Sequence, residues 1–177
     1  MDSPSPSVRL WDPLIRLFHW SLAGAFVANY FFTEEGDDWH QWIGYYAAAW
    51  LAIRLAWGFL GPASARWSDF WPTRARLGEH CRALRAGQRY HRLGHSPLGA
   101  LVMLLMMGLM AGLAVTGFLM QEVDYFWGAD GPLLVHETFA NLLLGLVILH
   151  VLAALYESVQ LRENLVVSMI TGKRRRL

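Results

Sequence analysis

Histidines within apolar stretches are the residues of this chain best suited to chemistry. Of its seven histidines, His19, His40, His136 and His150 fall within long apolar stretches, and His95 lies two residues before another. An ionisable residue is costly to bury in a membrane and marks a functional site by default. One such histidine is as readily explained by a hydrogen bond in a protein core, but four of them favour a common purpose.

The spacing of these histidines places them at two levels. His150 follows His136 by fourteen residues, which is ~21 Å along a helix and returns the side chain to within ~40° of the same face. If successive helices cross a membrane in alternate directions, His19 lies level with His150, and His40 lies level with His136. The order of the stretches therefore predicts the pairs His19/His150 and His40/His136.

Two histidines that face each other across a bundle core suit a flat iron macrocycle with one axial ligand on each side. A small residue follows each histidine by one helical turn and would let the backbone approach a porphyrin, although helix packing alone also favours small residues. These residues are Ala23, Gly44, Ala140 and Ala154. Zinc or copper is the competing metal, but such sites generally draw their ligands from one cluster.

The number of cysteines limits the kinds of metal and haem site that the chain can form. Cys81 is the only cysteine of the chain. A disulfide framework, a cysteine-based metal or iron–sulfur site and a Cys-x-x-Cys-His motif for covalent haem attachment are therefore excluded. Any haem is expected to be held non-covalently.

Four apolar stretches, each near or above the ~20 residues that a helix needs to cross a bilayer, must position the histidines. They cover residues 13–33, 39–60, 97–120 and 132–156. We therefore expect an all-α integral membrane four-helix bundle, with its domain over residues 13–161 and the lipid bilayer around it. Residues 1–12 are expected to be a flexible N-terminus and residues 162–177 a basic cytoplasmic tail. No nucleic-acid partner is expected.

The distribution of charge predicts the orientation in the membrane. Basic residues gather before the first stretch, between the second and third, and after the fourth, whereas the other two connections carry acidic residues and no Lys or Arg. The acidic residues are Glu34, Glu35, Asp37, Asp38, Glu122, Asp124 and Asp130. Because positive charge is retained on the cytoplasmic side during insertion, both termini should be cytoplasmic. The localisation expected is the inner membrane of a bacterium.

The helix boundaries and the basic connection carry local signals of their own. Asp12 and Ser96 each precede a proline, which predicts a capped helix start. Leu77, Cys81 and Leu84 recur at helical spacing among arginines. This pattern predicts a short amphipathic helix within residues 73–90 on the anionic inner surface, with a solvated basic loop as the alternative.

Four motifs of the chain resemble a known family. Two of them, in the second and fourth stretches, look like the bacterial cytochrome b561 family. The other two, at the start of the first stretch and before the third, are shared especially with the b-type cytochrome subunits of nickel–iron hydrogenases. In that order they are His40-x3-Gly44-x9-Arg54, His136-Glu-Thr-x-Ala-Asn141 with His150, Trp11-Asp-Pro-x-x-Arg-x-Phe-His19-Trp, and Gly94-His95-x-Pro97-Leu-Gly99-Ala. The resemblance implies His19, His40, His136 and His150 as axial ligands of two b haems.

Residues outside this ligand set could contact a haem or a quinone, or join the helices. Arg54, fourteen residues after His40, lies at the depth of the cytoplasmic-side haem and could pair with a propionate, or it could snorkel to the surface. His95 could bind a propionate or a quinone, or simply cap a helix. Asn141 is expected to bridge helices through its amide, and Gly108-x3-Gly112 permits close helix contact within the bundle or in a homodimer.

Several functions fit these features. The leading one is a dihaem cytochrome that transfers electrons between the quinone pool and a redox partner in a respiratory chain, for example a periplasmic c-type cytochrome. The second is the membrane anchor and electron-accepting subunit of a periplasmic hydrogenase or dehydrogenase. The third is a superoxide:quinone oxidoreductase, which the acidic loops disfavour because they repel an anion. A haem-free transporter or structural subunit leaves the level-matched histidines unexplained.

Overall fold

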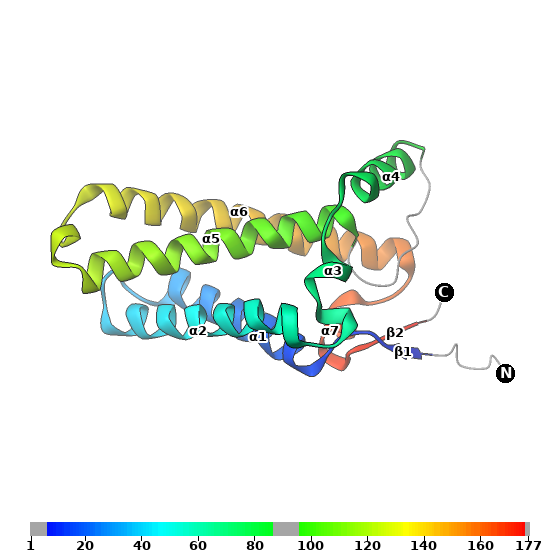
Figure 1. Ribbon diagram of the computed structural model, residues 1–177, viewed down its shortest axis with the longest axis horizontal. Helices are drawn as coiled ribbons and strands as arrows, with labels where there is room; N and C mark the ends of the chain where they lie inside the picture. Colours follow the sequence, from blue (N-terminus) through cyan, green and yellow to red (C-terminus); the bar gives the residue numbers. More distant parts are fainter. Residues whose placement is uncertain (1–6, 87–95, 176–177) are drawn as a thin grey trace. The chain divides into compact units, whose positions relative to one another are not determined.

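A computed structural model describes residues 7–86 and 96–175 of the chain. It divides into two compact units. The histidine unit comprises Leu17–Ala56 and Leu104–Ile148, and the terminal unit comprises Met1–Arg16, Trp57–Met103 and Leu149–Leu177. Helices dominate both units, and their order along the chain can be followed in Figure 1.

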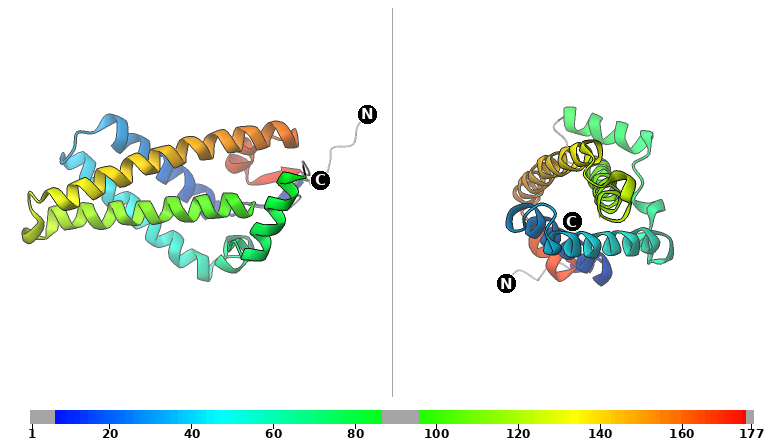
Figure 2. Two further views of the ribbon diagram at one scale, coloured as in Figure 1. Left: turned by 90° about the horizontal axis from the view of Figure 1, so that it is seen from above. Right: turned by 90° about the vertical axis from the view of Figure 1, so that its left-hand side faces the viewer.

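Four long helices correspond to the four apolar stretches. They are α1 (Pro13–Phe32), α2 (Asp38–Leu60), α5 (Pro97–Glu122) and α6 (Asp130–Leu161). The predicted caps form: the Asp12 carboxylate accepts from the backbone nitrogen of Leu14 at 2.7 Å, and Ser96 Oγ accepts from that of Gly99 at 3.2 Å. Within the histidine unit the chain forms two helical hairpins, α1–α2 and α5–α6, and α5 and α6 run alongside each other (Figure 2).

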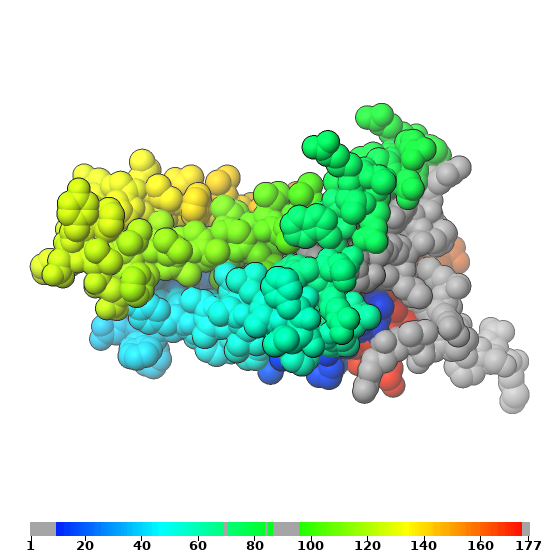
Figure 3. All heavy atoms as spheres, viewed as in Figure 1, coloured from blue at the N-terminus to red at the C-terminus, as the bar shows by residue number. Residues whose placement is uncertain are grey.

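Three of these helices are long and apolar enough to cross a membrane by length and composition. They are α2, α5 and α6; α1, with 20 residues, is not among them. Only 6% of the span window is buried inside the protein in α5 and in α6. Many of their large apolar side chains are exposed, as expected where lipid covers them, and Figure 3 shows atoms of α5 at the surface of one face.

Shorter elements occupy the connections. The basic connection contains η1 (Ala63–Ala65), α3 (Trp67–Phe70) and α4 (Arg74–Arg85). The helix α4 confirms the helix predicted within residues 73–90. His80 on this helix is buried, whereas its place in a basic connection would suggest a surface residue. The loop between α5 and α6 contains η2 (Asp124–Phe126).

The two ends of the described chain are joined, which the sequence did not predict. Strand β1 (Ser7–Arg9) pairs antiparallel with β2 (Lys173–Arg175). The backbone oxygen of Gly172 continues this pairing by accepting from the nitrogens of Leu10 at 2.9 Å and Trp11 at 3.2 Å. The described parts of the segments expected to be a flexible N-terminus and a basic cytoplasmic tail are thus held together by backbone hydrogen bonds.

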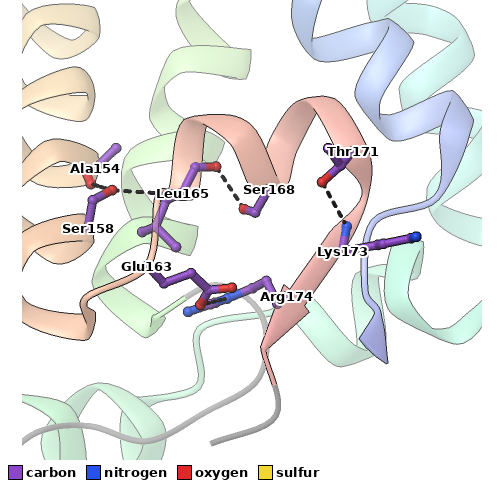
Figure 4. Close-up of polar contacts among 8 residues, drawn as sticks. All are labelled: Ala154, Ser158, Glu163, Leu165, Ser168, Thr171, Lys173 and Arg174. Carbon is purple, nitrogen blue, oxygen red and sulfur yellow. Dashed lines mark hydrogen bonds and ion pairs between the residues drawn. The ribbon is translucent and has the colours of Figure 1, made fainter. Parts of the chain in front are cut away.

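The helix α7 (Leu165–Thr171) leads into β2 and is fixed at both ends. Asn164 caps its start by accepting from the backbone nitrogen of Val167 at 3.0 Å, and Gly172 ends it with φ +78°, a conformation that glycine adopts without strain. Beside it, Arg174 forms a largely buried ion pair with Glu163 at 3.3 Å (Figure 4). These contacts explain why this segment is ordered where composition alone suggested a tail.

Candidate haem site

His40 and His136 meet within the histidine unit. His40 lies in the first turn of α2 and His136 in the second turn of α6, and their ring centres are 6.1 Å apart with an angle of 54° between the planes. Both side chains are half-buried. The predicted pair at this level is therefore brought together, although 96 residues separate its members in the sequence.

Nδ1 of each ring lies within hydrogen-bonding distance of a threonine hydroxyl. Nδ1 of His40 lies 3.1 Å from Oγ1 of Thr33, just beyond the end of α1, and Nδ1 of His136 lies 2.8 Å from Oγ1 of Thr116 on α5. The amide of Asn29 also donates to the backbone oxygen of His40 at 2.9 Å. With both Nδ1 atoms occupied in this way, the Nε2 atoms are the ring nitrogens left for a metal.

This geometry fits a haem iron. Two metal–imidazole bonds of about 2 Å each, with each nitrogen about 1 Å from its ring centre, separate the ring centres by about 6 Å. The two rings are that far apart. Two protein ligands are also the number that a six-coordinate haem takes, because the porphyrin supplies the other four.

Other metal sites are less well served by the described residues. Within residues 7–86 and 96–175, no three His, Cys, Asp or Glu side chains gather as potential ligands of one ion. Zinc sites draw three or four ligands from the protein. The donor set of two imidazoles therefore fits haem better than zinc.

Small residues lie where helices approach one another in this unit. A Cβ atom on Gly44 would lie 3.9 Å from the amide nitrogen of Asn29, and one on Gly117 would lie 3.5 Å from the His136 ring. A Cβ atom on Gly112 would overlap the Phe139 ring, whereas one on Gly108 would meet nothing within 4 Å. Of the predicted Gly108-x3-Gly112 motif, only Gly112 thus makes a close contact between α5 and α6.

Tyrosines add polar links between helices of the same unit. Tyr30 on α1 donates to the side-chain oxygen of Asn141 on α6 at 2.7 Å, so the prediction that Asn141 bridges helices is confirmed. Tyr45 on α2 donates to a carboxylate oxygen of Glu122 at the end of α5 at 2.6 Å. These bonds join the hairpin α1–α2 to the hairpin α5–α6.

The remaining predicted site residues are placed as follows. His19 lies on α1 in the histidine unit, with its ring in edge contact with Trp20 at 5.0 Å, and half-buried His150 lies on α6 in the terminal unit; their pairing stays a prediction. Arg54 on α2 is only 6% exposed, which disfavours the snorkelling alternative. His95 lies outside the described residues.

The residues that hold the histidine rings are not among those that the sequence pattern predicts. Thr116 carried a usable signal: it is the only side chain with a hydrogen-bonding group from Pro97 to Met120, and such residues in membrane helices tend to face a partner. Asn29 and Thr33 stand one turn apart at the end of α1, and nothing in their spacing singles them out.

Comparison with known proteins identifies the family of the chain. Residues 10–172 match the family described as prokaryotic cytochrome b561. The chain is 23% identical over 214 aligned positions to a probable Ni/Fe-hydrogenase B-type cytochrome subunit from Rhizobium leguminosarum bv. viciae, covering 95% of this chain and 89% of that protein. No solved structure matches. The chain therefore belongs to the prokaryotic cytochrome b561 family, and it is a multi-pass membrane b-type cytochrome of electron transfer.

Proposed function

We propose that the chain is a dihaem cytochrome of the bacterial inner membrane that carries electrons between the quinone pool and a redox partner. One haem is held by His40 and His136 near the periplasmic face, and the other by His19 and His150 near the cytoplasmic face. Four spans, with α1 as the first, place both termini in the cytoplasm. The observation that carries the proposal is the His40/His136 pair, with its ring separation of 6.1 Å and with both Nδ1 atoms turned to threonines.

The bundle supplies what such a conduit needs. The half-buried histidines would hold each macrocycle, and the surrounding helices would exclude water from it. The haem supplies the one-electron chemistry, while the protein sets its ligation and nearby charge. Arg54, buried on α2 fourteen residues after His40, is the proposed partner of a propionate at the cytoplasmic-side level.

Histidine substitutions test the ligand assignment. Purified wild-type protein should contain two non-covalent low-spin haems per chain. His40→Ala and His136→Ala should each remove the same component of a redox titration, because either change leaves one axial imidazole. His19→Ala and His150→Ala should remove the other component. The measurements are haem per chain and reduced-minus-oxidised spectra, with His80→Ala on α4 as a control that keeps both haems.

Other outcomes of this experiment are informative as well. We expect His95→Ala to keep both haems while electron transfer with quinone slows, because a hydrogen bond is lost and not a ligand. If His95→Ala removes a haem and His19→Ala does not, the cytoplasmic-side pair is His95/His150. A wild-type protein that folds with one haem or none contradicts the dihaem proposal.

A second candidate function is the electron-accepting membrane subunit of a hydrogenase. The name of the relative, a probable Ni/Fe-hydrogenase B-type cytochrome subunit, favours it. The two functions differ in the electron donor that reduces the haems in native membranes. Reduction by hydrogen gas that is lost in His136→Ala supports the hydrogenase subunit, whereas reduction by a quinol analogue alone supports the first function. Reduction by superoxide would support a superoxide:quinone oxidoreductase.

A further inference from the structure

The hydroxyl groups of Thr33 and Thr116 are each committed to a backbone oxygen. Thr33 Oγ1 donates to the backbone oxygen of Asn29 at 2.9 Å, and Thr116 Oγ1 lies 2.8 Å from that of Gly112 and 3.2 Å from that of Leu113. A hydroxyl carries one hydrogen and two acceptor lone pairs. With its hydrogen directed at its own helix, each threonine can only accept from the histidine that it contacts.

This direction fixes the tautomer of both histidines. A ring nitrogen that meets an acceptor must carry the proton, so Nδ1 of His40 and of His136 is protonated and Nε2 keeps its lone pair. A neutral imidazole with a free Nε2 is the form that binds iron. The two rings are thus set for ligation before any haem arrives.

We propose that Thr33 and Thr116 are positioning residues of the periplasmic-side haem, each holding one ligand histidine with Nε2 aimed at the iron. This inference rests on the proposed ligation by His40 and His136. A hydrogen bond from Nδ1–H orients the ring and raises the basicity of the ligating nitrogen, which tightens metal binding. A more basic ligand also donates more electron density to the ferric iron and lowers the reduction potential.

The hydrogen bonds of the two threonines to the histidines differ in strength. The Thr116 contact is shorter, 2.8 Å against 3.1 Å, and Thr116 is only 8% exposed, so little water competes with it. His40 has a second tie, because Asn29 also holds its backbone oxygen. Loss of the Thr116 hydroxyl should therefore have the larger effect.

A merely structural role is the alternative. Serine and threonine in helices often bond a carbonyl one turn back without any further function. Thr138 does this on α6: its hydroxyl donates to the backbone oxygen of Leu134 at 2.7 Å, and its side chain is exposed. Thr138, two residues after His136, is therefore a matched control for the loss of a threonine hydroxyl.

The experiment compares full-length Thr116→Val, Thr33→Val and Thr138→Val with the wild type in detergent. Thr116→Val should raise the haem dissociation constant of the His40/His136 component about 10–100-fold, shift its midpoint potential upward and alter its ferric low-spin EPR signal. Thr33→Val should change the same quantities in the same direction by less. Thr116→Ser, which keeps the hydroxyl, should have the wild-type haem dissociation constant, midpoint potential and EPR signal. Thr138→Val should have wild-type values of all three as well.

The outcomes separate this inference from the proposed function. A His136→Ala variant that loses one haem, together with a Thr116→Val variant that behaves like Thr138→Val, overturns the positioning role and leaves the ligand assignment standing. If His136→Ala keeps both haems, the ligand assignment fails and the inference falls with it. If Thr116→Val does not fold, Thr33→Val decides: wild-type affinity, potential and EPR signal in that variant refute the role.

Discussion

The variant Gly112→Ala tests how closely α5 and α6 approach each other beside the histidine pair. A Cβ atom at this position would overlap Cδ2 and Cε2 of the Phe139 ring. Gly112 precedes Thr116 by one turn, and Phe139 follows His136 by nearly one turn. Relief of the overlap by separating the helices would therefore lengthen the 2.8 Å contact between Thr116 and His136.

The expected magnitude follows from a comparison of two glycines. Inserting a methyl group into a packed contact typically costs about 1–3 kcal/mol. Alanine in a helix interior is favoured over glycine by up to about 1 kcal/mol, and both Gly112→Ala and Gly108→Ala gain this term. Because a Cβ on Gly108 would meet nothing within 4 Å, the difference between the two variants isolates the overlap and should be about 1–3 kcal/mol.

The assay is reversible unfolding of the purified protein in mixed detergent, followed by far-ultraviolet circular dichroism, with haem per chain as a second readout. Gly108→Ala should be as stable as the wild type or slightly more stable. Phe139→Ala should suppress the penalty of Gly112→Ala in a double-mutant cycle, because the overlapping ring is gone. Equal stability of Gly112→Ala and Gly108→Ala would refute the close approach of the two helices.

Two further predictions concern the chain ends and the orientation in the membrane. Gly172→Ala should destabilise the joined termini by about 1–2 kcal/mol, because φ is +78° there and the added Cβ would lie 3.0 Å from the Trp11 oxygen. Faster amide exchange at Leu10 and Trp11 would measure this loss of stability, and unchanged exchange would contradict the prediction. A reporter fused after Leu177 should be cytoplasmic and one inserted near Asp37 periplasmic, because positive charge stays inside; the reverse activities would exchange the sides of the two haem levels.

The long helices were predictable because their signals are local. Apolar length predicts α1, α2, α5 and α6 to within a few residues at most ends, and the caps at Asp12 and Ser96 form as expected. The pairing of β1 with β2 depends on backbone hydrogen bonds between residues more than 160 positions apart. Short basic strands carry no apolar alternation that would reveal such a pair.

The candidate site was predictable to the level of its histidines and not beyond. Topology and helical rise give the depth of His40 and His136, and depth alone pairs them. Which hydroxyl lies behind each ring depends on the rotation of each helix about its own axis and on the loop of residues 33–37. Rotation is set by packing contacts such as Gly112 with Phe139, and these appear only when the helices are in place.

A division of labour among the helices follows from the proposed ligation. At the periplasmic-side level, α2 and α6 supply the ligands, whereas Thr33 beyond α1 and Thr116 on α5 hold them from behind. The proposed cytoplasmic-side pair comes from α1 and α6, so α5 supplies no ligand at either level. Of the three candidate spans, α5 has the highest mean hydropathy. Its one hydroxyl, Thr116, lies where a histidine of the neighbouring helix needs an acceptor.

Moving this hydroxyl by one turn, in a Thr116→Val/Met120→Thr variant, should not restore the haem affinity lost in Thr116→Val, because the acceptor must face Nδ1 of His136. Recovery of wild-type haem affinity in the double variant would instead show that a polar group anywhere on α5 suffices.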